Sequence, residues 1–272
     1  TEEITAFTNE FYTVKADGKT YLVPKVLYNV TVTAEGENAA AEEILSDVVS
    51  VKRVDFINGV KKIADDAFRC YENVADNGDE LRVTLPSSLE EIGSYAFATR
   101  NDIFSITIND EVKKIGDYAF YNLRDLGKVV FGENSQLTES GARSFDGTSW
   151  RENSAGVIVA GKAVLGVSES YCRNKNYTEI TAWEMGMATY IAPYAFENNK
   201  ILRKIALGSE IKSIGDKAFG GMDSLTTFAF NKGSSDGSTR KLGEYVINDC
   251  NALVDLTIYE DINVEDLCEK LP

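Results

Sequence analysis

Residues 103–120 read Ile-Phe-Ser-Ile-Thr-Ile, then Asn-Asp-Glu-Val-Lys-Lys, then Ile-Gly-Asp-Tyr-Ala-Phe. The first word has apolar residues at Ile103, Ile106 and Ile108, and the last two alternate as in a short β-strand. The last word ends at Phe120 and combines glycine, alanine and an aromatic residue, which suits a tight return turn. The stretch therefore predicts a strand followed by a turn with an aromatic plug.

Both words recur along the chain at nearly constant spacing. Phe97 and Phe120 are 23 residues apart, and so are Phe196 and Phe219. The last apolar residue of the first word usually precedes the final Phe of the second by 12 residues. Copies of the first word begin at Val51, Ile103, Leu126, Leu202, Leu225 and Leu253, and copies of the second end at Phe68, Phe97, Phe120, Phe145, Phe196, Phe219 and Ile247.

A unit of about 23 residues cannot bury its own apolar face, so successive units must stack and share one core. The repeat therefore predicts a solenoid of about eight coils with short parallel β-strands, either mainly β or α/β. Tyr95, Tyr118, Tyr194 and Tyr245 each lie two residues before the end of the second word, where stacked coils would align them in a ladder.

The two words together resemble the BspA-type leucine-rich repeats of bacterial surface proteins, over roughly residues 46–272. The stretch Gly156-Val-Ile-Val-Ala-Gly-Lys-Ala-Val-Leu-Gly166 resembles a hairpin that interrupts those repeats. The second word decays near Ser140 and Leu242. The resemblance implies a leucine-rich-repeat solenoid and an extracellular or cell-surface location in a bacterium, and its adhesive members suggest binding of a protein or glycan.

The repeat defines the domain organisation that we expect. Residues 1–45 lack both words and read as an N-terminal β-rich cap, with a hairpin around Asp17-Gly18, a further strand and a short helix at 39–45; the alternative is a separate ligand-binding module. Residues 46–272 form the solenoid, interrupted by a hairpin-like excursion at about 146–183, and residues 264–271 are predicted to be a capping helix. The chain begins at Thr1 rather than Met, as a chain that has lost a signal or anchor would.

Composition excludes several classes of function. The net charge of −15 argues against general nucleic-acid binding, and no apolar run is long enough for a membrane span. The absence of histidine rules out a Ser-His-Asp triad and any zinc site that uses histidine. Cys70 and Cys250 are predicted to be buried in the stack, and a bond between Cys172 and Cys268 would have to cross several coils.

The acidic residues that recur near the return turns follow the repeat, so we expect them to serve the turn rather than catalysis. The sequence therefore predicts a protein that is not an enzyme and needs no cofactor or metal. The alternative to a binding module is a structural spacer that holds another domain away from a cell envelope. A carbohydrate-active enzyme would need two carboxylates in a deep pocket, which a regular solenoid sheet rarely provides.

Two features are candidates for partner binding. The outward positions of the strands include a basic stripe, and the excursion is bracketed by two tryptophans that could anchor a partner. Each feature has a structural alternative, namely a solvated strand face for the stripe and packing against the coils for the tryptophans. The candidate residues are Arg53, Arg82, Lys128, Lys204, Trp150 and Trp183.

Overall fold

The computed structural model describes residues 61–63, 65–69, 82–230 and 240–258, together with the backbone of five strands before residue 57. The chain folds as a parallel β-solenoid, which confirms the fold class predicted from the repeat, with about seven turns where about eight were expected. It divides into two compact units, each described by itself below. Unit 1 comprises residues 1–136 and 144–150, and unit 2 comprises residues 137–143 and 151–272.

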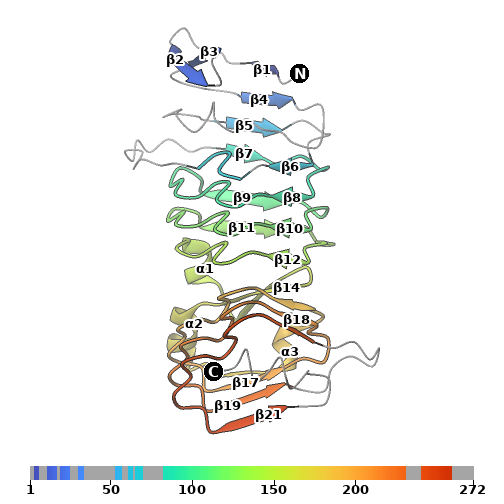
Figure 1. Cartoon of the computed structure of the whole chain (residues 1–272), viewed down its shortest axis with the longest axis vertical. Helices are drawn as coiled ribbons and strands as arrows, with labels where there is room; N and C mark the ends of the chain where they lie inside the picture. The colour runs from blue at the N-terminus through green and yellow to red at the C-terminus, as the bar shows by residue number, and fades with distance from the viewer. Residues whose placement is uncertain are drawn as a thin grey trace. The chain divides into compact units, whose positions relative to one another are not determined.

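Unit 1 contains two series of parallel strands, which Figure 1 shows as successive rungs. One series consists of strands of three or four residues, among which β9 shows alternating burial, and the other of two-residue strands. The longer strands are β4 (Val30–Thr33), β5 (Arg53–Phe56), β7 (Arg82–Thr84), β9 (Ser105–Ile108) and β11 (Lys128–Phe131). The short strands are β6 (Lys62–Ile63), β8 (Glu91–Ile92) and β10 (Lys114–Ile115). Before them, β1 (Glu3–Thr5) pairs antiparallel with β4, and β2 (Phe11–Ala16) with β3 (Lys19–Pro24).

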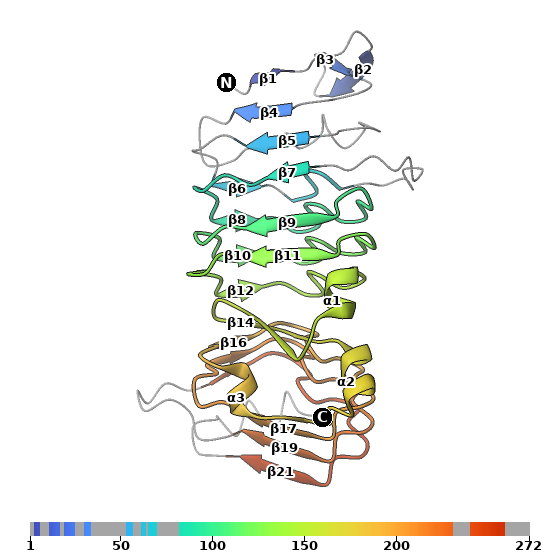
Figure 2. The ribbon, with the colours of Figure 1, turned by 180° about the vertical axis from the view of Figure 1, so that it is seen from behind.

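Unit 2 repeats this arrangement, as Figure 2 shows for the rungs β17, β19 and β21. The series that corresponds to the longer strands of unit 1 contains β15 (Glu179–Ile180), β17 (Lys204–Leu207), β19 (Thr227–Phe230) and β21 (Asp255–Ile258). The other series contains β14 (Ala163–Val167), β16 (Tyr190–Ile191), β18 (Ser213–Ile214) and β20 (Lys241–Leu242), with β13 (Val157–Ala160) antiparallel to β14. The unit also holds β12 (Glu139–Ser140), α2 (Glu169–Lys175) and α3 (Ala182–Met185), while α1 (Ser149–Asn153) spans the boundary between the units.

Each word of the repeat builds one part of the coil. The first word ends in a long strand whose inward residues are buried, as Ile106 and Ile108 are in β9, and the second word begins in a short strand. The constant spacing between the repeats places equivalent positions in register, so that Ile106 pairs with Val129 and Ile205 with Phe228. The buried aliphatic positions therefore line up from coil to coil and form the core.

The return turn depends on a left-handed residue at the same place in every described copy. This residue lies two positions before the final aromatic or aliphatic residue of the second word, and its φ is between 49° and 60°. A non-glycine residue rarely adopts this conformation, but in four copies its N–H donates to a carbonyl of the next coil, as from Tyr95 to Asp117 at 2.8 Å. The residues are Asp66, Tyr95, Tyr118, Arg143, Tyr194, Lys217 and Tyr245.

The phenylalanines of the second word stack inside each unit. Ring centroids of Phe97 and Phe120 lie 5.4 Å apart with nearly parallel planes, and those of Phe196 and Phe219 lie 5.1 Å apart. The adjacent glycine lets the backbones approach, because a Cβ on Gly116 would lie 2.4 Å from the backbone nitrogen of Ser94. The recurring words are thus explained by packing between coils.

The predicted hairpin around residues 17–18 is present as β2 and β3, and the hairpin predicted at 156–166 is present as β13 and β14. β14 also pairs in parallel with β16, so the excursion supplies a strand to the stack. The helices predicted at 39–45 and 264–271 lie outside the described residues, as do Cys70 and Cys268.

The prediction that Cys250 is buried needs correction. Cys250 is half-buried, whereas the equivalent Leu123 and Met222 are fully buried. Its Sγ lies 3.2 Å from the Phe219 carbonyl oxygen, and the partial burial raises the pKa of the thiol. Leu123 and Met222 are each covered by the coil that follows them. Cys250 belongs to the last described coil, so no described residues cover it from that side. Cys172, by contrast, is fully buried and free.

Candidate functional site

The described outward positions of the unit 1 strands carry only basic or uncharged side chains. Arg82 on β7 and Lys128 on β11 are exposed, and Ser105 lies between their strands, in register with Lys128. Neither Asp nor Glu occurs at the described outward positions of β7, β9 and β11, which are Arg82, Thr84, Ser105, Thr107, Lys128 and Val130. The backbone of Arg53 pairs with Arg82, but its side chain lies outside the described part.

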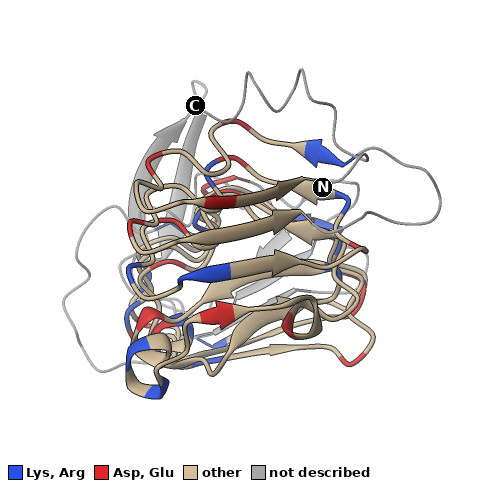
Figure 3. Cartoon of the chain, turned by 90° about the horizontal axis from the view of Figure 1, so that it is seen from below, with Lys and Arg blue, Asp and Glu red and all other residues tan. Residues whose placement is uncertain are grey.

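In unit 2 the corresponding positions carry charges of both signs (Figure 3). The Nζ of Lys204 on β17 lies 2.9 Å from a carboxylate oxygen of Glu179 on β15. The next two positions along this row are Thr227 and Asp255. Among the described residues, the predicted basic stripe is therefore reduced to Arg82 and Lys128 in unit 1, which Ser105 separates, and in unit 2 Lys204 is paired with Glu179.

Trp150 is half-buried and packs inside unit 1. Its ring centroid lies 5.0 Å from that of Phe145 and 6.1 Å from that of Phe131. Its backbone N–H donates to the Leu126 carbonyl at 2.7 Å. These contacts favour the packing interpretation of Trp150 over a role as an exposed anchor.

Trp183 has the opposite environment. It lies on the single helical turn α3, and 89% of its surface is exposed. Two other exposed apolar residues belong to the same part of unit 2: Met187, 65% exposed, follows α3, and Val159, 38% exposed, lies on β13, which α3 contacts. Isolated exposed apolar residues are common, but a largely exposed tryptophan beside two more is a candidate contact surface.

The helical turn that carries Trp183 is fixed from several sides. Thr181 and Glu184 form a capping box: the Thr181 hydroxyl accepts from the Trp183 N–H, and Glu184 Oε2 accepts from the Thr181 N–H at 3.0 Å. Met185 is fully buried beneath the turn. Gly186 ends the turn with φ 55° and ψ −128°, a combination that residues with a Cβ rarely adopt.

The electrostatics of this turn favour the capping arrangement. Partial burial opposes ionisation of Glu184, but hydrogen bonds from the side chain and backbone of Thr181 outweigh it and lower the pKa of the carboxyl. Burial raises the pKa of Tyr177, and the neighbouring Glu184 carboxylate raises it further. At neutral pH, therefore, Glu184 is ionised and Tyr177 remains a neutral phenol.

Polar groups border the exposed apolar residues. The Lys162 Nζ, from the turn between β13 and β14, lies 3.4 Å from the Met187 carbonyl oxygen. Ser209 is exposed and follows Gly208, where a Cβ would lie 3.6 Å from the Ala182 Cβ. Hydrogen-bonding groups thus lie at Met187 and beside Ala182, the residues that adjoin Trp183 on α3 and just after it.

Sequence reasoning identified Trp183 but missed the groups that hold it. The order Thr181-x-x-Glu184 matches the capping-box signature and could have predicted the helical turn. Met187 and Val159 carry no such local signal, because their exposure depends on how the excursion packs into unit 2.

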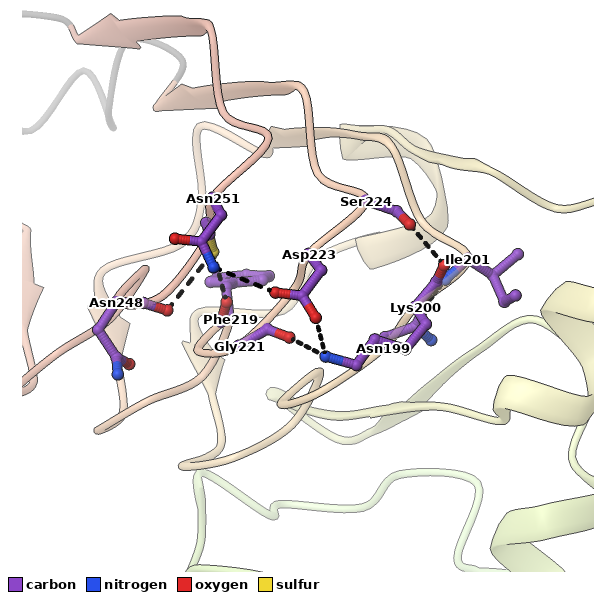
Figure 4. A network of polar contacts seen from close by, with 10 residues as sticks. Asn199, Lys200, Ile201, Phe219, Gly221, Asp223, Ser224, Asn248 and Asn251 are labelled. Carbon is purple, nitrogen blue, oxygen red and sulfur yellow. Dashed lines mark hydrogen bonds and ion pairs between the residues drawn. The ribbon is translucent and has the colours of Figure 1, made fainter.

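A polar network at the turns of unit 2 shows how the repeat uses its charged residues elsewhere (Figure 4). The Lys200 Nζ donates to the Gly221 carbonyl at 2.8 Å and to Asp223 at 2.5 Å, and Asn251 contacts the other carboxylate oxygen. The hydrogen bond from Lys200 lowers the pKa of Asp223. These contacts join successive coils, so we assign them to the stack.

Two features are absent from the part of the chain that the structure describes. No group of three or more Cys, Asp or Glu side chains is arranged to hold a metal ion. None of the described helices has the length and hydropathy needed to cross a membrane.

Comparison with known families assigns the repeat. The family described as BspA type leucine rich repeat region matches residues 41–155 and 167–268, in six copies. The chain belongs to this family, as the resemblance of its two words suggested. The search of curated proteins found no match.

Solved structures similar to the chain are bacterial leucine-rich-repeat proteins. The pneumococcal vaccine antigen PcpA is 16% identical with a TM-score of 0.40, over 96% of this chain and 82% of that chain. A leucine-rich repeat protein from Eubacterium ventriosum is 16% identical with a TM-score of 0.41, over 96% and 73%. A leucine rich cell surface protein from Faecalibacterium prausnitzii is 13% identical with a TM-score of 0.35, over 98% and 97%.

Proposed function

We propose that this protein is a non-enzymatic binding module, secreted or displayed on the surface of a bacterium, that recognises a protein or a glycan through the outward face of its solenoid. Its family consists of repeat proteins suited to surface interaction. Stacked coils present regular rows of outward side chains, which create an extended surface for a macromolecule.

The observation that carries this proposal is the outward face of unit 1. Its described strands present exposed Arg82 and Lys128 among small or neutral residues, in a chain whose net charge is −15. A local basic face on an acidic protein attracts acidic groups of a partner and orients it during encounter.

The test is an array of extracellular-matrix proteins and glycans probed with the purified chain at low and at physiological salt. We expect a saturable hit that weakens with salt, because exposed charge pairs are screened at distances beyond about 10 Å. Reversal of one exposed charge, Lys128→Glu, should weaken that hit about fivefold. The matched control Lys114→Glu alters an exposed lysine on β10, away from this face, and should leave the hit unchanged.

A hit that responds equally to both variants would contradict recognition through the unit 1 face. The absence of any hit would overturn the proposal and favour a structural spacer.

A further inference from the structure

We propose that Trp183 is a stacking platform for a pyranose ring of a neutral glycan. This inference rests on the proposed binding function and names the partner of a second part of the surface, on unit 2. Its basis is the combination of an exposed indole, a fixed helical turn that carries it and a hydrogen-bonding group at Met187, just after that turn.

Trp183 departs from the repeat, whereas structural features of this fold follow it. Ile180 pairs with Ile205, and counting onward places Trp183 opposite Gly208 of the next coil. That coil continues as strand β17 to Leu207, while the coil of Trp183 leaves the strand at Thr181 and forms α3. Packing between coils explains the recurring phenylalanines but gives no reason for an exposed tryptophan here.

The turn beneath the indole is already ordered before any partner arrives. The capping box, the buried Met185 side chain and the Gly186 conformation each restrict the backbone of α3. An aromatic side chain on an ordered backbone loses little conformational entropy when it is covered, so more of the contact energy remains for binding.

The surroundings fit a sugar better than a protein. A stable protein interface buries about 800 Å² on each partner, with a ring of contacts that excludes water from its anchor residues. Among the described residues, the other exposed large apolar side chains on α3, on the strands β13 and β17 that it contacts, and directly after α3 are Val159 and Met187. Lys162 reaches the Met187 carbonyl oxygen, and the exposed Ser209 follows Gly208, which lies against Ala182 of α3. A pyranose ring presents C–H bonds on its face and hydroxyls around its rim, which matches a flat indole bordered by polar groups.

Charge selects a neutral sugar over an acidic one. The ionised Glu184 on α3 and the Lys162 Nζ beside Met187 carry opposite charges, and Glu179 is paired with Lys204, so these side chains give no net attraction for an acidic sugar. The net charge of −15 disfavours a carboxylated or sulfated sugar.

The chain has two tryptophans, so the variant Trp150→Phe leaves Trp183 as the single fluorescent reporter. We would titrate this variant with neutral tetrasaccharides of glucose, mannose, galactose and N-acetylglucosamine, with oligogalacturonate as the acidic comparison. One neutral sugar should produce a saturable blue shift, since the exposed indole becomes covered.

A second measurement avoids any disturbance of the fold by Trp150→Phe: the same sugars are measured by calorimetry on the wild-type chain and on Trp183→Ala. We expect at least a tenfold loss of affinity in Trp183→Ala and a smaller loss in Trp183→Phe.

The inference is overturned if every neutral sugar leaves both signals unchanged, or if oligogalacturonate binds more tightly. It also fails if a Trp183-dependent array hit is a protein. A salt-sensitive array hit that is weakened by Lys128→Glu and unaffected by Trp183→Ala would retain the proposed function while removing this glycan site.

Discussion

The two tryptophans lie near the start and the end of the same excursion and have opposite environments. Trp150 packs against Phe145 and Phe131 in unit 1, while Trp183 is 89% exposed on α3 in unit 2. In the sequence both appear where the regular repeat is interrupted. Residues at an interruption of the repeat are therefore candidates for partner binding, but their side-chain packing decides which of them is exposed to a partner.

The largest expected effect is a difference in the free energy of unfolding between the alanine variants of Trp150 and Trp183. Trp150→Ala should lower the free energy of unfolding by about 3 kcal/mol, because it removes an aromatic side chain packed on the phenylalanine stack. Trp183→Ala should change it by no more than about 0.5 kcal/mol, because the side chain is exposed. Urea denaturation followed by circular dichroism measures both. Equal losses would show that Trp183 also has a structural role and would remove the contrast.

Much of the fold could be predicted because packing between coils repeats the same residues. The long strands, the short strands and the return turns all follow from Ile106, Ile115 and Phe120 and their equivalents, since each must meet its counterpart in the next coil. The basic residues could be placed on strand faces by alternation alone.

The rest depended on contacts that the sequence does not encode locally. The ion pair between Glu179 and Lys204 arises from strand pairing with an irregular coil, whose register follows from the repeat only if two residues are inserted before Phe196. The exposure of Trp183 depends on α3, which replaces a strand just where the repeat is least regular. The left-handed conformation of Tyr95 and its equivalents was also missed, because tyrosine gives no signal for a positive φ.

A second test concerns the glycine that ends α3. Gly186→Ala should destabilise the turn by about 2 kcal/mol, because its φ and ψ strain any residue with a Cβ. A Cβ there would meet no atom within 4 Å, so the effect is conformational rather than steric. Fluorescence anisotropy of Trp183 in the Trp150→Phe background should fall as the indole gains mobility.

Gly156 provides the matched control for that substitution. It also has a positive φ and open space around a Cβ, but it lies before β13. Gly156→Ala should cost about 1 kcal/mol and leave the anisotropy of Trp183 unchanged. A drop in anisotropy for both variants would mean that Trp183 does not depend on its own turn.

The capping box gives a smaller effect. Thr181→Ala removes the hydroxyl that accepts from the Trp183 N–H and should cost about 1 kcal/mol. Thr181→Ser keeps the hydroxyl and should retain most of that stability. Urea denaturation, with Trp183 emission as the local signal, distinguishes the two. If serine is as damaging as alanine, the methyl group rather than the cap holds the turn.

The smallest expected effect is a change with pH at the same turn. The folded pKa of Glu184 lies below its ordinary value of 4.5, so its ionised form stabilises the turn. That stabilisation is fully present above pH 4.5 and is lost as pH falls through the lower folded pKa. Tyr177, the titratable group that faces Glu184, stays neutral across this range because its pKa is raised. In the Trp150→Phe background, Trp183 anisotropy should therefore fall below pH 4.5, whereas Glu184→Gln, which can still cap but cannot ionise, should show no such step. A step of equal size in Glu184→Gln would assign the titration to another carboxyl and remove Glu184 from the support of Trp183.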